Sequence, residues 1–156
     1  VKVESAAQML EQCLLLLPDC DIFIACAAVA DYRPATVEQQ KIKKGPQQIN
    51  LLLVRNPDIV ATVAASEQRP FIVGFAAETQ ELLTHAREKM SHKGLDMIIA
   101  NDVSDRSIGF NSDNNRATVL WADGEQPLPL CSKAAMARQV IALIARQLAP
   151  SSCSRR

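Results

Sequence analysis

The chain has 156 residues, of which 48% are hydrophobic, so it is long and apolar enough to bury one compact core. Its 17 lysines and arginines balance its 17 aspartates and glutamates, and this zero net charge argues against a general polyanion binder such as a nucleic-acid-binding domain. Any phosphate site must therefore be local. No apolar run reaches the ~18 residues that span a bilayer, so we expect no membrane partner.

The first third of the chain predicts a helix, a buried strand and a loop. Residues 5–17 repeat apolar side chains at helical spacing, and Ser5 is a suitable N-cap. Residues 21–29 form a continuous apolar run, which is typical of a strand buried on both faces. Residues 32–48 are polar, with glycine and proline, and therefore predict a loop.

The middle of the chain repeats this alternation of strand and helix. In the first of its helices, either Asn56 is the N-cap with Pro57 at the first helical position, or the helix starts one residue later. Gly74 interrupts the second buried strand, and the next helix is capped by Thr79 and stopped by Gly94. The predicted strand, helix, strand and helix cover residues 49–54, 56–65, 71–75 and 79–93.

The last third predicts a third buried strand, a polar loop, a hairpin and a final helix. The hairpin turns at Asp123 and Gly124, and Pro127 and Pro129 confine its second arm to a sheet edge. The strand, loop, hairpin and helix cover residues 95–100, 101–115, 117–130 and 132–148. The residues of this helix that we expect to face the core are Met136, Val140, Leu143 and Ile144.

Helix and buried strand alternate three times, which indicates parallel strands joined by crossover helices. We therefore predict an α/β, Rossmann-like three-layer fold with a mostly parallel sheet and an appended C-terminal β-hairpin. Residues 1–149 form one domain, and residues 150–156 are a disordered tail.

The cysteines indicate the cellular compartment. Their number is odd and none has zinc-site or CxxC spacing, so we expect free thiols and a cytoplasmic location. They are Cys13, Cys20, Cys26, Cys131 and Cys153.

Small side chains at Ala25, Cys26 and Ala27 allow a ligand close to the backbone, and Asp31 follows at the end of the strand. Ligands of open α/β sheets bind at the carboxyl ends of strands. A lysine cluster that begins at Lys41 then suggests an anionic, nucleotide-like ligand, although a solvated basic loop explains the cluster equally well.

The candidate residues later in the chain also have both a functional and a structural explanation. Lys89 and Lys93 share a helix face, where compensation of the helix dipole is the stronger explanation. Phe75 is either a nucleobase platform or a core residue, and the Asn-Pro-Asp helix start either holds an anion or simply caps. Asn101 ends the third strand with a polar group on the ligand side. GxGxxG and P-loop motifs are absent, and the sequence leaves the metal ligands unknown.

Together these segments resemble phosphopantothenate–cysteine ligase. AAVADYRP, KIKK, NPDIVA, VGFAAET and GFNSDNN occur in this order, and the resemblance covers residues 1–148. The family member that it resembles is the CTP-dependent bacterial form, phosphopantothenoylcysteine synthetase. That domain usually forms the C-terminal half of a bifunctional coenzyme A biosynthesis protein whose other half is a flavin-dependent decarboxylase.

The resemblance implies a two-step ligation in a homodimer. The carboxylate of 4′-phosphopantothenate attacks the α-phosphate of CTP, giving an acyl-cytidylate and pyrophosphate. The amino group of cysteine then displaces CMP and forms the amide. Mg²⁺ accompanies the triphosphate, and FMN belongs only to the decarboxylase half.

The resemblance also implies a site. Lys41 is the mobile-loop lysine that closes on CTP, Asp31 contacts the nucleotide near its ribose, and Phe75 packs on it. The other nucleotide-binding residues that it implies are Ala25, Cys26, Ala27, Pro57, Asp58, Ile59, Val60, Lys89 and Lys93.

One departure from the family concerns the start of the chain. The family's ligase domain begins with a GGT-type loop and a DPVRxIxNxSSG segment, and this sequence starts after both. We therefore expect weak or no ligase activity from this chain alone. Two other functions stay open, namely a nicotinamide-dependent Rossmann oxidoreductase and a non-catalytic dimerisation module whose hairpin pairs across a two-fold axis.

Overall fold

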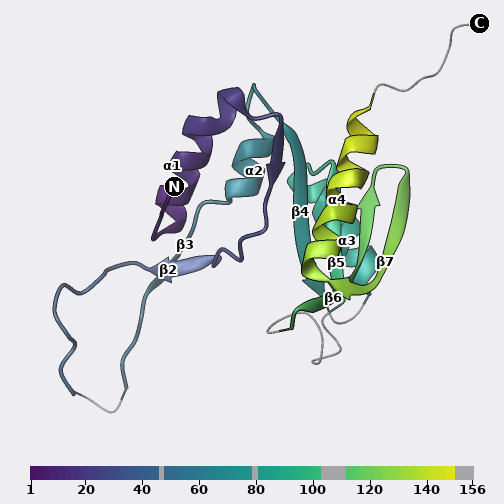
Figure 1. Cartoon of the computed structure of the whole chain (residues 1–156). Coiled ribbons are helices and arrows are strands. Elements are labelled where there is room, and N and C mark those ends of the chain that lie inside the picture. The colour runs from purple at the N-terminus through teal and green to yellow at the C-terminus, as the bar shows by residue number, and fades with distance from the viewer. Residues whose placement is uncertain (46–47, 79–80, 103–111, 150–156) are drawn as a thin grey trace, which may run out of the picture. The chain divides into compact units, whose positions relative to one another are not determined.

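The computed structural model describes residues 1–45, 48–78, 81–102 and 112–149, so the predicted tail lies outside the described residues. The chain forms two compact units (Figure 1). The N-terminal unit contains Val1–Cys20 and Ala27–Pro70, and the sheet unit contains Asp21–Cys26 together with the chain from Phe71 onward. Each unit is described by itself below.

The sheet unit is built on a five-stranded sheet in the order β1-β4-β5-β6-β7. The first three of these strands are parallel, and β6 and β7 continue the sheet as an antiparallel hairpin. This arrangement confirms the predicted α/β fold and the C-terminal hairpin. The strands are β1 (Ile22–Ile24), β4 (Phe71–Glu78), β5 (Met97–Asp102), β6 (Asn114–Trp121) and β7 (Gly124–Ser132).

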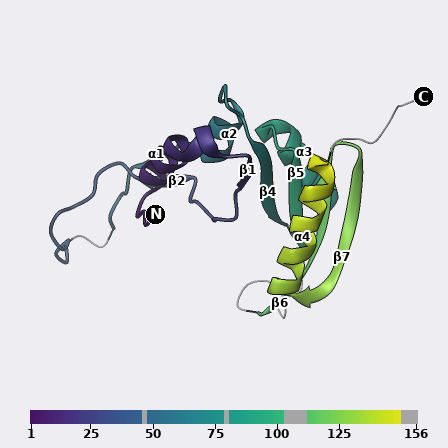
Figure 2. The ribbon, with the colours of Figure 1, turned by 45° about the horizontal axis from the view of Figure 1, so that its top comes forward.

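Two helices cover opposite faces of this sheet, α3 (Leu82–Lys93) and α4 (Lys133–Leu148) (Figures 1 and 2). Alternate strand residues therefore face opposite layers: Val73 packs in a buried cluster with α4, and its neighbour Ile72 is buried on the other face. The four α4 residues predicted to face inward are all buried, namely Met136, Val140, Leu143 and Ile144.

Local signals fix where these elements begin and end. Gly94 ends α3 in the left-handed region, with φ 64°, as its position predicts. The carboxylate of Asp96 accepts a hydrogen bond of 2.7 Å from the amide of Ile72, which ties the start of β5 to β4. Ser132 caps α4 by accepting from the amide of Ala135 at 3.2 Å.

The N-terminal unit contains two helices and a separate two-stranded antiparallel ribbon. Helix α1 begins with the predicted Ser5 cap, which forms a capping box with Gln8. In the ribbon, Tyr32 pairs with Arg55. The elements are α1 (Ala6–Leu16), the 3₁₀ turn η1 (Leu17–Asp19), β2 (Tyr32–Pro34), β3 (Leu53–Arg55) and α2 (Ile59–Ala64).

Strand β1 is much shorter than the predicted strand over residues 21–29. After Ile24, the amide of Cys26 donates a hydrogen bond to the carbonyl of Ile24 at 3.1 Å. In the same way, the amide of Val29 donates to the carbonyl of Ala27 at 3.2 Å. These three-residue turns take the place of ladder hydrogen bonds, so the strand ends. The prediction that this strand is buried on both faces was also wrong, because β1 is an edge strand of the sheet and Ile22 is exposed.

Other element limits also differ from the prediction. Tyr32–Pro34 is a strand, although residues 32–48 predicted a loop, and its partner begins only at Leu53. Strand β4 passes Gly74 without a break. Helix α3 begins at Leu82, while its predicted cap Thr79 lies outside the described residues. The hairpin turn is one residue earlier than predicted, because Trp121 pairs with Gly124.

The left-handed position at the end of α3 gives a test of the fold. Gly94→Ala should lower the free energy of unfolding by about 1 kcal/mol, because a side chain disfavours a φ of 64°. Gly45→Ala is the matched control, because a Cβ there would meet only the carbonyl oxygen of Lys43 at 3.9 Å. Denaturant unfolding of both variants measures the difference, and equal stabilities would contradict this account of the α3 terminus.

Candidate functional site

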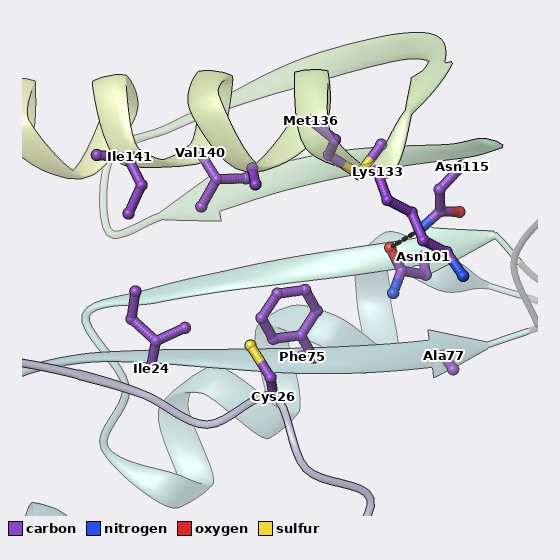
Figure 3. Close-up of a pocket in the computed structure, with 11 residues that line it drawn as sticks. Ile24, Cys26, Phe75, Ala77, Asn101, Asn115, Lys133, Met136, Val140 and Ile141 are labelled. Carbon is purple, nitrogen blue, oxygen red and sulfur yellow. Dashed lines mark hydrogen bonds between the residues drawn. The ribbon is translucent and has the colours of Figure 1, made fainter. Parts of the chain in front are cut away.

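A cavity of about 470 Å³ lies in the sheet unit, between α4 and one face of strands β1, β4 and β5 (Figure 3). Most of its wall is apolar. The volume is in the usual range for small-molecule sites. The apolar and sulfur-containing residues that line it are Ile24, Cys26, Phe75, Ala77, Met136, Ala137, Val140 and Ile141.

The polar groups of the cavity gather at one end, where β4 and β5 reach their carboxyl ends. Asn115 is buried, with 9% of its surface exposed, and its side-chain amide donates to the Oδ1 of Asn101 at 3.0 Å. The Oδ1 of Asn115 accepts from the amide of Arg116 at 2.9 Å, so the orientation of this pair is fixed. Lys133 extends its ammonium group to the same end, beside Asn101 (Figure 3).

The end of β1 forms another part of the wall. The amide of Ala25 donates to the carbonyl of Val73 at 2.8 Å, which extends the parallel ladder by one bond before the chain turns away. Cys26 follows and lines the cavity. Partial burial raises the pKa of the Cys26 thiol, so the thiol is neutral near pH 7 and is not an activated nucleophile.

Lys89 places a positive charge beside the C-terminal half of β4. Its ammonium donates to the carbonyl of Phe75 at 3.0 Å, and the side chain is half-buried. An ammonium group has three donors, so this bond leaves others for a ligand. Lys93 lies one turn further along α3 and is also half-buried. The ring of Phe75 faces the cavity and packs against the α4 core cluster.

In the N-terminal unit, the structure joins two of the segments predicted to bind a ligand. The amide of Asn56 donates to the carbonyl of Asp31 at 2.8 Å, and its side chain donates to the carbonyl of Ala30 at 2.8 Å. Arg33 adds a bond of 3.1 Å to the Oδ1 of Asn56. These contacts hold the segment after β1 against the Asn-Pro-Asp segment, and the side chain of Asp31 stays exposed.

The Asn-Pro-Asp segment caps α2 differently from either predicted form. Asp58, rather than Asn56, is the N-cap, and its carboxylate accepts from the amide of Ala61 at 3.0 Å. Ile59 is buried, whereas Pro57 and Val60 are half-buried. Asn56 cannot cap α2, because its side-chain amide is engaged by Ala30 and Arg33.

The predicted site residues are therefore divided between the units. Ala25, Cys26, Phe75, Lys89 and Lys93 belong to the sheet unit, and among them Cys26 and Phe75 meet in the cavity. The others belong to the N-terminal unit, where Lys41 is exposed in the loop between β2 and β3. Convergence of Asp31, Lys41 and Phe75 stays a prediction. The residues of the N-terminal unit are Ala27, Asp31, Lys41, Pro57, Asp58, Ile59 and Val60.

Sequence reasoning missed most of the cavity lining, including its polar residues Asn115 and Lys133. Asn115 occupies an inward position in the alternating burial pattern of β6, and a polar residue at such a position was the available signal. Lys133 and Ala137 share a face with the predicted core residues of α4, but nothing in the sequence places that face over a cavity.

The structure thus defines a Rossmann-like α/β domain with a ligand-sized cavity at the carboxyl edge of its parallel strands. The model of one family, described as the DNA/pantothenate metabolism flavoprotein C-terminal domain, matches residues 1–148. The chain belongs to that family. Among the described residues, no helix is long and apolar enough to cross a membrane.

Known proteins agree with this assignment. The "Coenzyme A biosynthesis bifunctional protein CoaBC" of Vibrio cholerae is 52% identical over 151 residues, which cover 95% of this chain and 38% of that protein. The first matched relatives are longer proteins, of which the chain spans 36–38%. A crystal structure of the C-terminal domain of CoaBC matches with a TM-score of 0.76 at 34% identity, covering 95% of this chain and 65% of that one.

A second solved structure shows the same fold at lower identity. It is a Cab2 mutant in complex with phosphopantothenate-cysteine, and it matches with a TM-score of 0.70 at 20% identity. The match covers 98% of this chain and 55% of the other chain.

The asparagine pair gives a test of the site's geometry. Asn101→Ala should lower the free energy of unfolding by about 1–2 kcal/mol, because the buried amide of Asn115 then loses its acceptor. Asn114→Ala is the control, since the Asn114 side chain is exposed. Denaturant unfolding measures both changes, and an Asn101 variant as stable as its control would show that the pair contributes nothing to folding.

Proposed function

We propose that the chain is the ligase domain of a coenzyme A biosynthesis enzyme, which joins 4′-phosphopantothenate to cysteine at the expense of CTP. Membership of the pantothenate metabolism family and the similarity to CoaBC proteins support this proposal. The observation that carries it is the half-buried ammonium of Lys89, held 3.0 Å from the carbonyl of Phe75 in the C-terminal half of β4. An ammonium group held in this way can neutralise the phosphate charge of an anionic nucleotide.

The proposed reaction needs positioning and charge neutralisation more than a nucleophilic side chain. Attack of the substrate carboxylate on the α-phosphate of CTP gives an acyl-cytidylate and pyrophosphate, and the amine of cysteine then displaces CMP. Negative charge develops on the α-phosphate in the first step, and lysine ammonium groups stabilise it. The raised pKa of the Cys26 thiol agrees with a backbone role for this residue rather than covalent catalysis.

We assign the cations to different parts of the nucleotide. Lys89 and Lys93 lie one turn apart on α3, and we assign them to the bound triphosphate. Lys41 lies in the β2–β3 loop, and this exposed position suits a residue that closes on CTP once the nucleotide is bound. The exposed carboxylate of Asp31 suits the ribose hydroxyl groups.

Mg²⁺ would arrive with the triphosphate. The described residues contain no group of three or more His, Cys, Asp or Glu side chains arranged to hold a metal. A Mg²⁺ ion that is bound mainly by phosphate oxygens and water would not need such a group, because Mg²⁺ keeps most of its waters and needs few protein ligands. Its chemistry would be neutralisation of the phosphate charge.

We further propose a cytoplasmic homodimer. Strand β7 is the outer strand of the sheet, and it carries Pro127 and Pro129. These prolines limit how two copies of the chain could pair through this strand. Proline has no amide hydrogen to donate, so these residues disfavour pairing of β7 with a second copy. A side-chain interface therefore suits the dimer better than a sheet continued across a two-fold axis.

A thermal-shift panel with CTP, ATP, UTP and GTP, each with Mg²⁺, tests the nucleotide. Near a hundredfold excess over Kd, a ligand stabilises the folded state by about 2.7 kcal/mol, which raises the Tm of a chain of this size by roughly 5–10 °C. We expect CTP to give the largest increase. Equal increases with all four nucleotides, or none, would contradict CTP use.

Substitution of Lys89 tests the observation that carries the proposal. Lys89→Met should weaken CTP binding by about tenfold or more, because a charge-assisted bond to phosphate is lost, whereas Lys89→Arg should keep part of the affinity. Lys2→Met is the matched control, since Lys2 is an exposed lysine outside the site. Unchanged CTP affinity in the Lys89→Met variant would remove the support that this contact gives.

A further inference from the structure

Two side chains join the chain segments at the end of the β2–β3 ribbon in the N-terminal unit. The Nη1 of Arg33 donates to the carbonyl of Arg55 at 2.7 Å and to the Oδ1 of Asn56 at 3.1 Å. The side-chain amide of Asn56 donates to the carbonyl of Ala30 at 2.8 Å. The Arg33–Asn56 pair therefore ties the residues that enter β2 to the residues that leave β3.

The pair continues the ribbon past the point where its backbone ladder ends. The outermost ladder pair is Tyr32 with Arg55. Extension of this register by one pair places Asp31 opposite Asn56, and the amide of Asn56 donates to the carbonyl of Asp31 at 2.8 Å. The side-chain bonds of Asn56 then fix the relative position of the two segments beyond the ladder.

Each of the two segments carries groups that the proposed function assigns to the nucleotide. Asp31 is exposed, and its carboxylate is assigned to the ribose. Residues 57–60 directly follow Asn56, and they are left for the base because the lysines are assigned to the triphosphate. More than twenty residues separate the two segments in sequence, so no local chain geometry sets the distance between these contacts.

The separation of these contacts matters to a nucleoside, whose base and ribose are joined by one bond. Protein groups that bind both parts must be held at a matching separation, because ordering them during binding would cost affinity. The pair itself lies near the surface, since Arg33 is exposed and Asn56 is half-buried. Water can replace hydrogen bonds at such positions, so they add little to folding. The pair therefore suits the organisation of a site better than the stability of the fold.

We infer that Arg33 and Asn56 are positioning residues for the nucleoside part of CTP. They hold the carboxylate of Asp31 at a fixed separation from residues 57–60, and they act through these groups without touching the nucleotide. The inference rests on the proposed function and deepens it. It predicts that the pair affects binding of the base and ribose but not binding of the triphosphate, which is assigned to the lysines.

Two ligands, each with Mg²⁺, separate these parts of the nucleotide in calorimetric titrations. Arg33→Met and Asn56→Ala should each weaken binding of CTP by about tenfold and leave binding of inorganic tripolyphosphate within about twofold. Asn56→Ala changes no charge, so its effect cannot come from weaker attraction of an anion. Arg33→Lys should keep most of the CTP affinity, because an ammonium group can donate to the same two oxygens. Equal weakening of both ligands would overturn the positioning role.

Arg138→Met and Gln68→Ala are the matched controls. Arg138 is exposed on α4 and Gln68 is exposed after α2, so each control removes a guanidinium or a carboxamide outside the pair. Both should bind CTP as tightly as the unsubstituted chain. Thermal unfolding compares the folds, and the Arg33 and Asn56 variants should keep a Tm within about 5 °C of the unsubstituted chain. A much larger decrease of Tm in both would assign the pair to the fold and overturn the inference.

Removal of the Asp31 carboxylate tests the positioning directly. Asp31→Asn should weaken CTP binding by about tenfold in the unsubstituted chain, but by less than about threefold in the Asn56→Ala variant. The reason is that a carboxylate whose position is no longer fixed contributes less to binding. Losses that simply multiply in the double variant would contradict the inference.

Titration of the unsubstituted chain with CTP, ATP, UTP and GTP separates this inference from the proposed function. If the chain prefers CTP and the Arg33→Met and Asn56→Ala variants bind CTP equally tightly, the positioning role is wrong and the proposed function stands. If the unsubstituted chain shows no preference for CTP, the proposed function is wrong, and the positioning role is wrong with it.

Discussion

The parallel pairing of β4 with β5 is the constraint on which the site depends. Six consecutive residue pairs, from Val73 with Met97 to Glu78 with Asp102, set the register of the two strands. Because parallel strands end at the same edge, Ala77 and Asn101 lie side by side there. The hydrogen bond from the amide of Ile72 to the carboxylate of Asp96 fixes the start of this register. A slip of β5 by one residue against β4 would turn Asn101 to the face opposite Phe75, away from α4.

The antiparallel hairpin explains why α4 reaches the same edge. Strand β5 runs toward that edge, β6 begins there, and β7 returns to it, so that Asn114 pairs with Ser132. Helix α4 therefore starts where the parallel strands end, and its first residue is Lys133. The directions of the strands alone therefore place Lys133 at this edge, where its ammonium group lines the cavity. A third parallel crossover after β5 would have started the next helix at the same edge, but with a different residue.

Local signals in the sequence were reliable wherever a few neighbouring residues decide the outcome. The Ser5 cap and the Gly94 terminus are formed within one turn of helix, and both were predicted. The apolar face of α4 was predicted for the same reason, since periodicity of 3.6 residues is a local property.

Prediction failed where distant residues compete for the same backbone groups. Tyr32–Pro34 is a strand because it pairs with Leu53–Arg55, and no signal within residues 32–48 reports that partner. The helix start at Asp58 follows from the capture of Asn56 by Ala30 and Arg33, which are more than twenty residues away in sequence. The cavity was missed for this reason too, because it needs Asn101, Asn115 and Lys133 from three separate elements.

We propose that a chain of zero net charge binds an anionic nucleotide. The partners of its individual cations explain how this is possible. Arg87 is paired with the carboxylate of Glu125 at 2.7 Å, so its charge is largely cancelled at the surface. Lys89 lies on the same helix, but the partner that orients it is the carbonyl of Phe75, at 3.0 Å. A carbonyl dipole fixes the ammonium without neutralising it, so the full positive charge stays available to phosphate. Net charge is then a poor guide to phosphate binding, because the type of partner decides which cations remain available.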